Sequence, residues 1–513
     1  MRLLTLLALS LCLSGCAARA QTLPDVFPAI PEIRAVNHVA KVVLHVVGDY
    51  DTHGPQFMYG LAVGQVPTIR VEPGDTIAMT VYNDLPKSTM SPDTVNVHFH
   101  GLEVSPNAPG DEVLMTLARP GQVLHYRVHI PLTQEPGLYW YHPHAMPETY
   151  WQVSYGMSGV IVVEGMQRHF PALAAMKERI IVLRDVPTIG GMFDDLDDVT
   201  PAQLHRRANG AKITGPACRP ETNLQPTFNR EGRAVVGIAP GERQFFRVVN
   251  ASAARYFDVA VPGENLQLVA MDGIALDAYP GQRSSQVVPD IVLPPAGRAE
   301  FIVTGQARPS LFVSKCFDAG PGGDADPAVV LADLRDPGYA QAAITGAPTP
   351  SPGPDVTYAP IELSAGQALP DNTMSQAAPA PAAQRRVVLS EVGTKFLING
   401  MAFMMGRAPM FVARSGTVEE WNVYNKTDEV HAFHIHQVHF LLLANDGRDP
   451  GYRRWLDTVN VPPRSRKPDG TYMPGSVRIL VDFRDPIVRG TLVFHCHILD
   501  HEDHGMMATI RVI

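Results

Sequence analysis

Three short segments of the chain follow the same pattern of residues. Each begins with a glycine and ends nine residues later with an asparagine, and the three glycines are Gly74, Gly241 and Gly416. In every copy an apolar residue stands five positions after the glycine and a valine stands seven positions after it. Because alternate residues of a strand share a face, this spacing predicts one buried strand face in each copy. The copies are spaced as domains are, so the pattern predicts three β-sandwich domains of one type.

The composition favours strands and turns over long helices. The 513 residues include 46 Pro and 42 Gly, and only 18% are charged, against about 5% Pro and about 25% charged residues in ordinary proteins. We therefore expect an all-β chain with domains at 37–165, 176–346 and 385–513, and a Pro- and Ala-rich linker at 347–384. A net charge of −9 without a basic cluster argues against nucleic acid and anionic membrane surfaces as partners.

The N-terminus has the features of an export signal. Arg2 precedes an apolar run, residues 3–13, that is too short to cross a bilayer. Two processing sites remain open. Cleavage at a small-residue site would remove residues 1–20. Alternatively, the sequence that ends in Cys16 resembles a bacterial lipoprotein box, in which residues 1–15 are removed and the cysteine carries a lipid anchor. Both predict a periplasmic or otherwise extracytoplasmic protein, and we expect no transmembrane segment and a monomer.

Two of the five cysteines are candidates for a disulfide. Cys12 and Cys16 belong to the export signal, and Cys496 lies between two histidines. Cys218 and Cys316 remain, and an oxidising compartment permits them to pair.

Ten of the nineteen histidines are concentrated in four short clusters. Each cluster contains two histidines separated by one residue, which puts two imidazoles on one face of a strand. In the last cluster Cys496 points to one face and its two histidine neighbours to the other, so two adjoining metal sites are predicted. A thiolate with imidazoles and a thioether favours copper, and eight paired imidazoles exceed the needs of one zinc site. The clusters are His98 and His100; His142 and His144; His431, His434 and His436; and His495, Cys496, His497 and His501, with Met506 beyond them.

These clusters resemble the signatures of the multicopper oxidases, the family of laccases, bilirubin oxidases and copper-efflux oxidases. The resemblance covers most of the chain and keeps the spacing inside every cluster. It implies three cupredoxin-like Greek-key β-sandwich domains and four copper ions. It also implies a type 1 copper held by His431, Cys496, His501 and Met506, a type 2 copper held by His98 and His434, and a type 3 pair held by His100, His142, His144, His436, His495 and His497.

The resemblance implies an oxidase with dioxygen as its acceptor. A reductant would lose one electron at a time at the type 1 copper, and electrons would pass through Cys496 to His495 and His497. Dioxygen would be reduced to water by four electrons at the trinuclear cluster. The reductant would be a phenol or aromatic amine, or a reduced metal ion such as Cu(I), Fe(II) or Mn(II). The alternative is a non-enzymatic copper-sequestering protein of copper tolerance, against which the intact ligands of both kinds of site argue.

Three carboxylates and a group of methionines are further candidates for function. Glu502 and Asp111 resemble acidic proton donors of the family and are candidate catalytic residues; an ordinary surface or salt-bridged carboxylate is the alternative for each. Asp457 resembles a carboxylate near the type 1 site in relatives. A cuprous ion would suit thioethers, but strand packing is favoured for the methionines, which are Met401, Met404, Met405 and Met410.

Overall fold

The structure is a computed structural model that describes residues 27–48, 54–60, 62–64, 66–87, 93–187, 224–339, 351 and 358–513. The predicted export signal, with Cys12 and Cys16, lies outside these residues. Cys316 is disulfide-bonded, and its predicted partner Cys218 also lies outside the described residues. Among the described residues, no helix is both long enough and apolar enough to cross a membrane.

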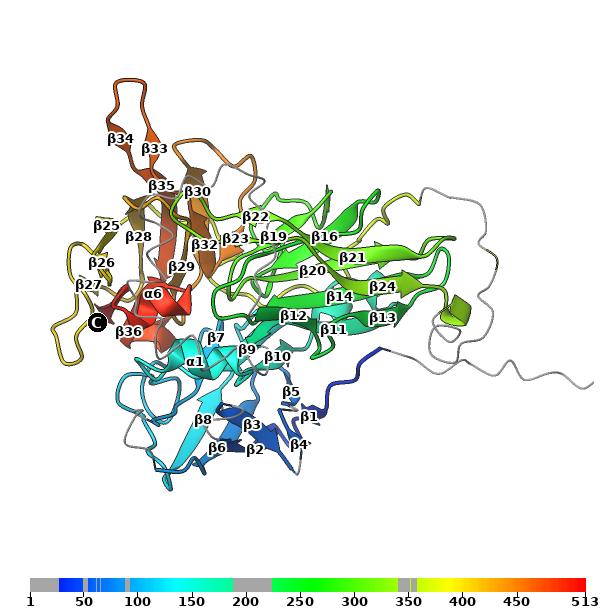
Figure 1. The fold of residues 1–513 in the computed structure, drawn as a ribbon, viewed down its shortest axis with the longest axis horizontal. Coiled ribbons are helices and arrows are strands. Elements are labelled where there is room, and N and C mark those ends of the chain that lie inside the picture. The colour runs from blue at the N-terminus through cyan, green and yellow to red at the C-terminus, as the bar shows by residue number, and fades with distance from the viewer. Residues whose placement is uncertain are drawn as a thin grey trace, which may run out of the picture.

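The chain forms three β-sandwiches in succession around a common junction, as Figure 1 shows. In the first domain, strands such as β8 (Val123–His129) alternate strictly between exposed and buried residues, because one face of the sheet meets the core and the other meets solvent. One sheet has the order β1 (Glu32–Arg34), β5 (Thr68–Val71), β10 (Gly159–Val163), β9 (Gly137–His142) and β7 (His98–His100). The other has the order β4 (Ala62–Val63), β3 (Gln56–Tyr59), β2 (Val39–Val47), β6 (Thr76–Asn83) and β8.

The second domain is built from a larger and a smaller sheet. The larger has the order β12 (Leu224–Phe228), β11 (Lys177–Pro187), β14 (Arg243–Asn250), β20 (Arg298–Thr304), β16 (Leu266–Met271) and β17 (Ile274–Ala275), with β18 (Gln286–Val288) paired to β16. The smaller has the order β13 (Ala234–Gly237), β24 (Val329–Arg335), β21 (Ser310–Lys315), β15 (Phe257–Ala260) and β19 (Ile291–Leu293).

The third domain repeats this arrangement. One sheet has the order β26 (Lys395–Ile398), β25 (Ala383–Val392), β28 (Thr417–Asn425), β35 (Gly475–Phe483), β30 (Phe440–Asn445) and β31 (Trp455–Leu456). The other has the order β27 (Phe411–Ala413), β37 (Met507–Val512), β36 (Gly490–Cys496), β29 (His431–Ile435) and β32 (Thr458–Val461). Trp421 is fully buried in the core between the two sheets.

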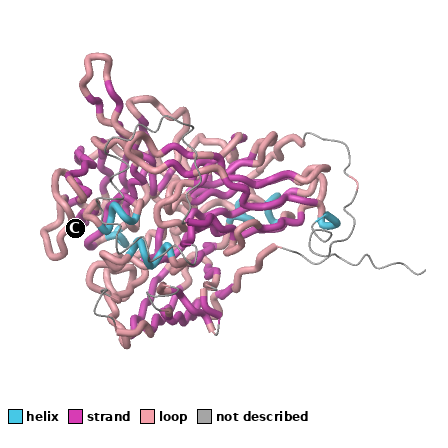
Figure 2. The backbone as a smooth tube through the Cα atoms, in the orientation of Figure 1, coloured by secondary structure: helices cyan, strands magenta, loops and turns pink. Residues whose placement is uncertain are grey.

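The remaining elements are two small hairpins and a few short helices. Figure 2 shows how little of the chain is helical. The hairpins are β22 (Phe317–Asp318) with β23 (Ala325–Asp326), and β33 (Ser465–Arg466) with β34 (Tyr472–Met473). The short helices among the described residues include α1 (Thr149–Ser154), α2 (Met166–His169), α3 (Pro171–Ala174), the 3-10 turn η1 (Pro486–Val488) and α6 (Leu499–Asp503). Of these, α1 and α6 lie side by side where the first and third domains meet (Figure 1).

The three segments of the sequence repeat have the same structure. Each glycine has a positive φ, of 95° at Gly74, 75° at Gly241 and 85° at Gly416, a conformation that favours glycine. The strands that follow are β6, β14 and β28. Each pairs in parallel with an earlier strand, β2, β11 or β25, and antiparallel with a later one, β8, β20 or β35. The predicted all-β fold, with three domains of one type, is confirmed.

The asparagine at the end of each repeat explains the fixed spacing. Asn83, Asn250 and Asn425 are all fully buried. In each case the side-chain amide donates to two backbone carbonyls, and its oxygen accepts from the backbone N–H two residues later. One side chain therefore closes the loop that follows the strand. In the third domain it fixes the segment that leads into β29.

The described part of the Pro- and Ala-rich segment packs between domains. Leu363 and Met374 are buried, and the Asn372 amide donates to Glu135 Oε1 of the first domain at 2.7 Å. The Trp455 indole N–H donates to the Met374 carbonyl at 3.2 Å. This connection therefore contacts both the first and the third domain.

We expect Asn425→Ala to destabilise the third domain by roughly 2–5 kcal/mol, because it removes the amide donor from two backbone carbonyls and the acceptor of the Thr427 N–H. Urea denaturation of the purified protein measures the loss. Asn250→Ala is the matched control, since it removes the same bonds from the second domain. A change below about 1 kcal/mol in both variants would contradict the role given to these amides.

Candidate metal centre

The four histidine clusters lie on or directly after two pairs of neighbouring strands, except that His501 lies on α6. β7 pairs antiparallel with β9, which brings His98 opposite His142. β29 pairs antiparallel with β36, which brings His434 opposite His495. The ten histidines and Cys496 are buried, and the most exposed of them, His501, exposes only 7% of its surface.

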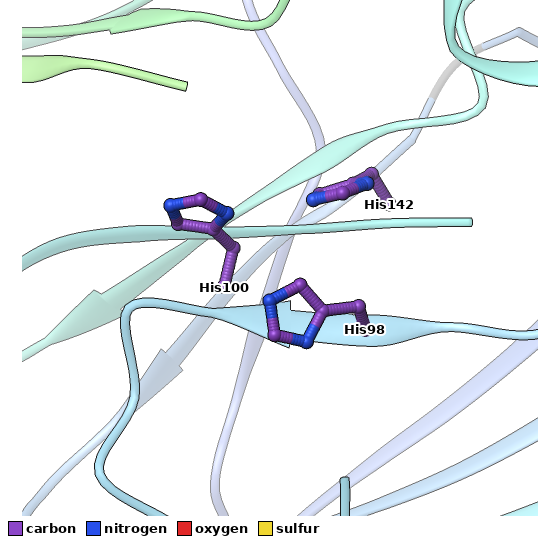
Figure 3. A group of neighbouring side chains, drawn as sticks. All are labelled: His98, His100 and His142. Atoms are coloured by element: carbon purple, nitrogen blue, oxygen red, sulfur yellow. The ribbon is translucent and has the colours of Figure 1, made fainter. Parts of the chain in front are cut away.

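Eight of the histidines form one large cluster between the first and third domains. Figure 3 shows three of its members from the first domain, His98, His100 and His142, with their rings close together. Rings from the two domains stack on each other, with centroids 3.7 Å apart for His98 and His436 and 4.0 Å apart for His100 and His434. The cluster contains His98, His100, His142, His144, His434, His436, His495 and His497.

A second, smaller cluster consists of His431, Cys496 and His501. The Cys496 sulfur lies 3.5 Å from His431 Nδ1 and 3.6 Å from His501 Nδ1, and the two nitrogens are 3.1 Å apart. Met506 is fully buried, and its carbonyl accepts the Cys496 N–H at 3.1 Å. Two imidazoles and one thiolate that converge on one point are the ligand set of a blue-copper centre.

Cys496 joins the two clusters. Its side chain belongs to the smaller cluster, whereas His495 and His497, its neighbours in the chain, belong to the larger one. This is the alternation along a strand that the sequence predicts. The two sites are therefore connected by one stretch of backbone.

Burial keeps the imidazoles neutral. Desolvation lowers the pKa of His431 and of His144 to about 3, and that of His495 to about 4. It also raises the pKa of the Cys496 thiol well above its usual range. Neutral imidazoles have lone pairs for a metal, and a bound cation would deprotonate the thiol that burial otherwise keeps protonated.

The ring nitrogens of the large cluster fit bound metal. In several rings one nitrogen is held by a protein oxygen while the other is buried without a partner. His98 Nδ1 lies 2.9 Å from Asp111, His142 Nδ1 lies 2.8 Å from the Pro143 carbonyl, and the Nε2 of each ring has no partner. Acceptors behind a ligand fix its tautomer and ring orientation. The unpartnered nitrogens are His98 Nε2, His100 Nδ1, His142 Nε2, His434 Nε2, His436 Nδ1 and both of His497.

Both predicted acidic residues contact histidines of the large cluster. Glu502 is fully buried, with its carboxylate oxygens 3.0 Å from His495 Nδ1 and 3.5 Å from His144 Nδ1. Burial raises its pKa above the usual range. Asp111 accepts the Phe99 N–H at 2.9 Å in addition to its contact with His98, and burial raises its pKa to about 6. Neither is an ordinary surface carboxylate.

Asp457 lies in a different place from the one expected. The sequence suggested a carboxylate beside the type 1 site, but Asp457 Oδ1 lies 3.2 Å from His100 Nε2 in the large cluster. The reason is strand register, since β29 pairs with β32 so that His434, and not His431, faces the start of β32 next to Asp457. Its role therefore concerns the large cluster.

The methionines are mostly exposed. The exposed fractions of Met401, Met404 and Met405 are 40%, 61% and 47%, so the packing interpretation is wrong for these three. Met410 does pack against the core of the third domain. The loop that carries the exposed methionines contacts the turn after α6, where the Phe403 N–H donates to the Gly505 carbonyl at 2.9 Å.

Other residues near the clusters were not found from the sequence. Glu429 Oε1 lies 3.4 Å from His501 Nε2 in the small cluster, and burial and acidic neighbours raise its pKa well above the usual range. His439 is buried and lies 3.0 Å from Glu103 Oε1. Arg298, from the second domain, is bonded to Asp457. In the sequence, Glu429 and His439 could have been noticed only because they lie close to the third histidine cluster. Their contacts could not be predicted, because their partners are distant in the chain.

Fold and site together define a β-sandwich metalloprotein with two adjoining metal sites. Multicopper oxidase family models match residues 64–168, 198–325 and 376–513. The chain belongs to the multicopper oxidase family, whose members are copper-binding oxidoreductases that use oxygen.

Known relatives span nearly the whole chain. It is 24% identical over 454 residues to multicopper oxidase mco of Staphylococcus haemolyticus, which covers 87% of this chain and 81% of the relative. It is 26% identical over 576 residues to multicopper oxidase LPR1 of Arabidopsis thaliana, with coverages of 96% and 92%. Among solved structures, a multicopper oxidase from Campylobacter jejuni described as a metallo-oxidase superposes with a TM-score of 0.69 at 22% identity, covering 96% of each chain. That likeness confirms the cupredoxin-like fold.

The residue that follows α6 gives a pH-dependent prediction. His504 Nδ1 lies 3.2 Å from Asp500 Oδ1, and hydrogen bonding to Asp500 raises the pKa of His504 from 6.5 to about 9. Because the pKa is higher in the folded state, the pair stabilises the fold fully below about pH 6.5 and loses this effect as the pH rises through 9. We expect His504→Gln to lower the urea midpoint of the copper-free protein at about pH 6 but not at about pH 10.

Asp500→Asn serves as the partner control for this prediction, because it removes the same pair from the other side. An equal loss of stability at both pH values would contradict the assignment of the effect to a protonated His504.

Proposed function

We propose that the protein couples one-electron oxidation of a reductant at a type 1 copper to the four-electron reduction of dioxygen to water at a trinuclear copper cluster. The observation that carries this proposal is that β36 contributes ligands to both clusters. Cys496 is placed to receive an electron at one cluster, and the backbone to His495 and His497 leads to the other. A protein that only stored copper would have no need for this connection.

The proposed ligand assignment follows the two clusters. His431, Cys496, His501 and Met506 would hold the type 1 copper; His98 and His434 would hold the type 2 copper; and the type 3 pair would be held by His100, His142, His144, His436, His495 and His497.

Bound copper supplies one-electron redox chemistry at each ion. The chain itself orients the imidazoles, excludes water from them and manages protons. Reduction of one dioxygen to two waters consumes four electrons and four protons. Burial raises the pKa values of Glu502 and Asp111, which favours the protonated acids. Both carboxyls contact cluster histidines, so we propose them as the proton donors.

We propose a reduced metal ion, Cu(I) first, as the physiological donor. The support is Glu429, whose carboxylate lies 3.4 Å from His501 Nε2, the edge of the small cluster that retains some exposure. Burial and acidic neighbours raise the pKa of Glu429, so its carboxyl would lose its proton when a cation binds there. The exposed thioethers of Met401, Met404 and Met405 suit a cuprous ion. A phenol or aromatic amine is the second candidate. The predicted export signal supports a role outside the cytoplasm, and lipid anchoring at Cys16 is likewise a prediction.

Copper counting combined with oxygen uptake tests this function. We expect the copper-loaded protein to hold four copper ions, to be blue, and to consume oxygen with Cu(I) faster than with a phenol. Cys496→Ser should lose the blue colour and the oxygen uptake while keeping the fold and the other three ions. Fewer than four ions in the unaltered protein, or four ions without oxygen uptake for any donor, would contradict the proposal.

Glu502→Gln tests the proton donor. We expect turnover under saturating reductant to fall by about 10²-fold or more with full copper loading, because the amide has no acidic proton to give. The matched control is Glu135→Gln, which changes another buried carboxylate that contacts Asn372 rather than a cluster histidine. Unchanged oxygen consumption in Glu502→Gln would remove this residue from the proton path.

A further inference from the structure

We infer that the second domain, which contributes no ligand cluster, positions the histidines of the trinuclear site through Arg298, acting by way of Asp457. This inference rests on the proposed function, since it concerns the trinuclear site assigned there. It makes Arg298 a positioning residue for the copper ligands of two other domains.

Arg298 contacts all three domains at once. It begins β20 and is fully buried. Two of its nitrogens donate to the Asp457 carboxylate of the third domain, at 2.8 Å to Oδ1 and 2.5 Å to Oδ2. Its Nε donates to the Leu138 carbonyl of the first domain at 3.3 Å, on the strand that ends at His142. A further bond runs to the Asp272 carbonyl of its own domain at 2.9 Å.

Asp457 connects Arg298 to two histidines of the large cluster. Its Oδ1 lies 3.2 Å from His100 Nε2, and its backbone carbonyl lies 2.8 Å from His434 Nδ1. Because these acceptors take the N–H of each ring, the lone pairs are left on His100 Nδ1 and His434 Nε2. Those are the nitrogens without a protein partner. Asp457 thus sets both the tautomer and the direction of two ligands from two domains.

The surroundings leave the pair little freedom. The Asp272 side chain binds the backbone of both residues of the pair. Its Oδ1 accepts the Arg298 N–H at 3.0 Å, and its Oδ2 accepts the Asp457 N–H at 3.3 Å. Gly101, directly after His100, has a φ of 83°, and a Cβ there would stand 2.4 Å from an Arg298 nitrogen and 2.8 Å from Asp457 Oδ2. The backbone that carries His100 therefore passes directly against the ion pair, where only glycine fits.

The planar fork of arginine matters for this role. A bidentate arginine fixes both the position and the plane of a carboxylate, whereas lysine offers a point charge without that geometry. Removing the arginine would leave a buried carboxylate without its counter-charge, which would then reorient or take up a proton. Either change releases His100 Nε2, and movement of Asp457 also shifts the backbone carbonyl that faces Nδ1 of His434, the proposed type 2 ligand.

Copper retention in Arg298→Met tests the inference. We expect 10–100-fold weaker retention of the trinuclear copper against a chelator, the range typical for residues behind metal ligands. The type 2 signal in electron paramagnetic resonance should shift or disappear, while the type 1 signal and the blue colour stay. Arg298→Lys should keep the charge but recover only part of the retention.

Arg247→Met is the matched control. Arg247 lies on β14 of the same domain, is equally buried and pairs with Glu178 at 2.9 Å, with no bond to a cluster histidine or to Asp457. It should bind all four copper ions with unchanged spectra, even if its unfolding midpoint falls. Equal loss of type 2 copper in both arginine variants would overturn the inference, because general destabilisation would then explain it.

The double variant Arg298→Met with Asp457→Asn tests the order of action. If Arg298 acts through Asp457, the double variant loses no more trinuclear copper than whichever single variant loses more. Losses that add fully in the double variant would overturn the inference. If Arg298→Met does not fold, Arg298→Lys and Asp457→Asn decide by the same spectra. Fewer than four copper ions in the unaltered protein would contradict the proposed function, whereas four ions there and unchanged type 2 copper in Arg298→Met would contradict this inference alone.

Discussion

The removal of water from a group of imidazoles is the constraint on which the rest of the structure depends. Eight rings in one buried space cannot all be charged, and desolvation lowers their pKa values accordingly. Each neutral ring has a nitrogen lone pair that can accept a hydrogen bond. A buried lone pair without a donor is costly inside a protein unless it binds a metal. The surrounding carboxylates and carbonyls orient the rings, and the sandwiches hold these acceptors in place.

The three sandwiches share one construction but contribute differently to the site. In each, a glycine begins the central strand and a buried asparagine closes the loop that follows it. The first and third domains present their histidines from the other sheet of the sandwich, on or directly after β7, β9, β29 and β36. The described residues of the second domain contain no such cluster, yet Arg298 extends from it into the junction. A domain without ligands can therefore still be part of a metal site.

Much of the fold and site could be predicted because the relevant information is local in the sequence. The Gly-to-Asn spacing reflects a single strand and its loop, and the alternation around Cys496 follows from strand geometry alone. The expected position of Asp457, beside the type 1 site, was wrong. Its neighbours depend on the register between β29 and β32, which no local sequence pattern encodes. Arg298 was not found, since its partner is 159 residues away. The exposure of Met401 and its neighbours likewise depends on how a loop folds over the turn at Gly505.

The long separations within the junction bear on how the protein is made. His100 and Asp457 are in contact although they are 357 positions apart in the sequence, and the stacked rings at the junction come from the first and third domains. During synthesis from the N-terminus, the first domain exposes four histidines long before their counterparts exist. Closing so long a loop is slow but costs little more than closing a shorter one. A chain cut short before residue 431 has four of the eight histidines of the large cluster and none of the small cluster, so complete metal binding is itself a sign that the third domain has been translated and folded.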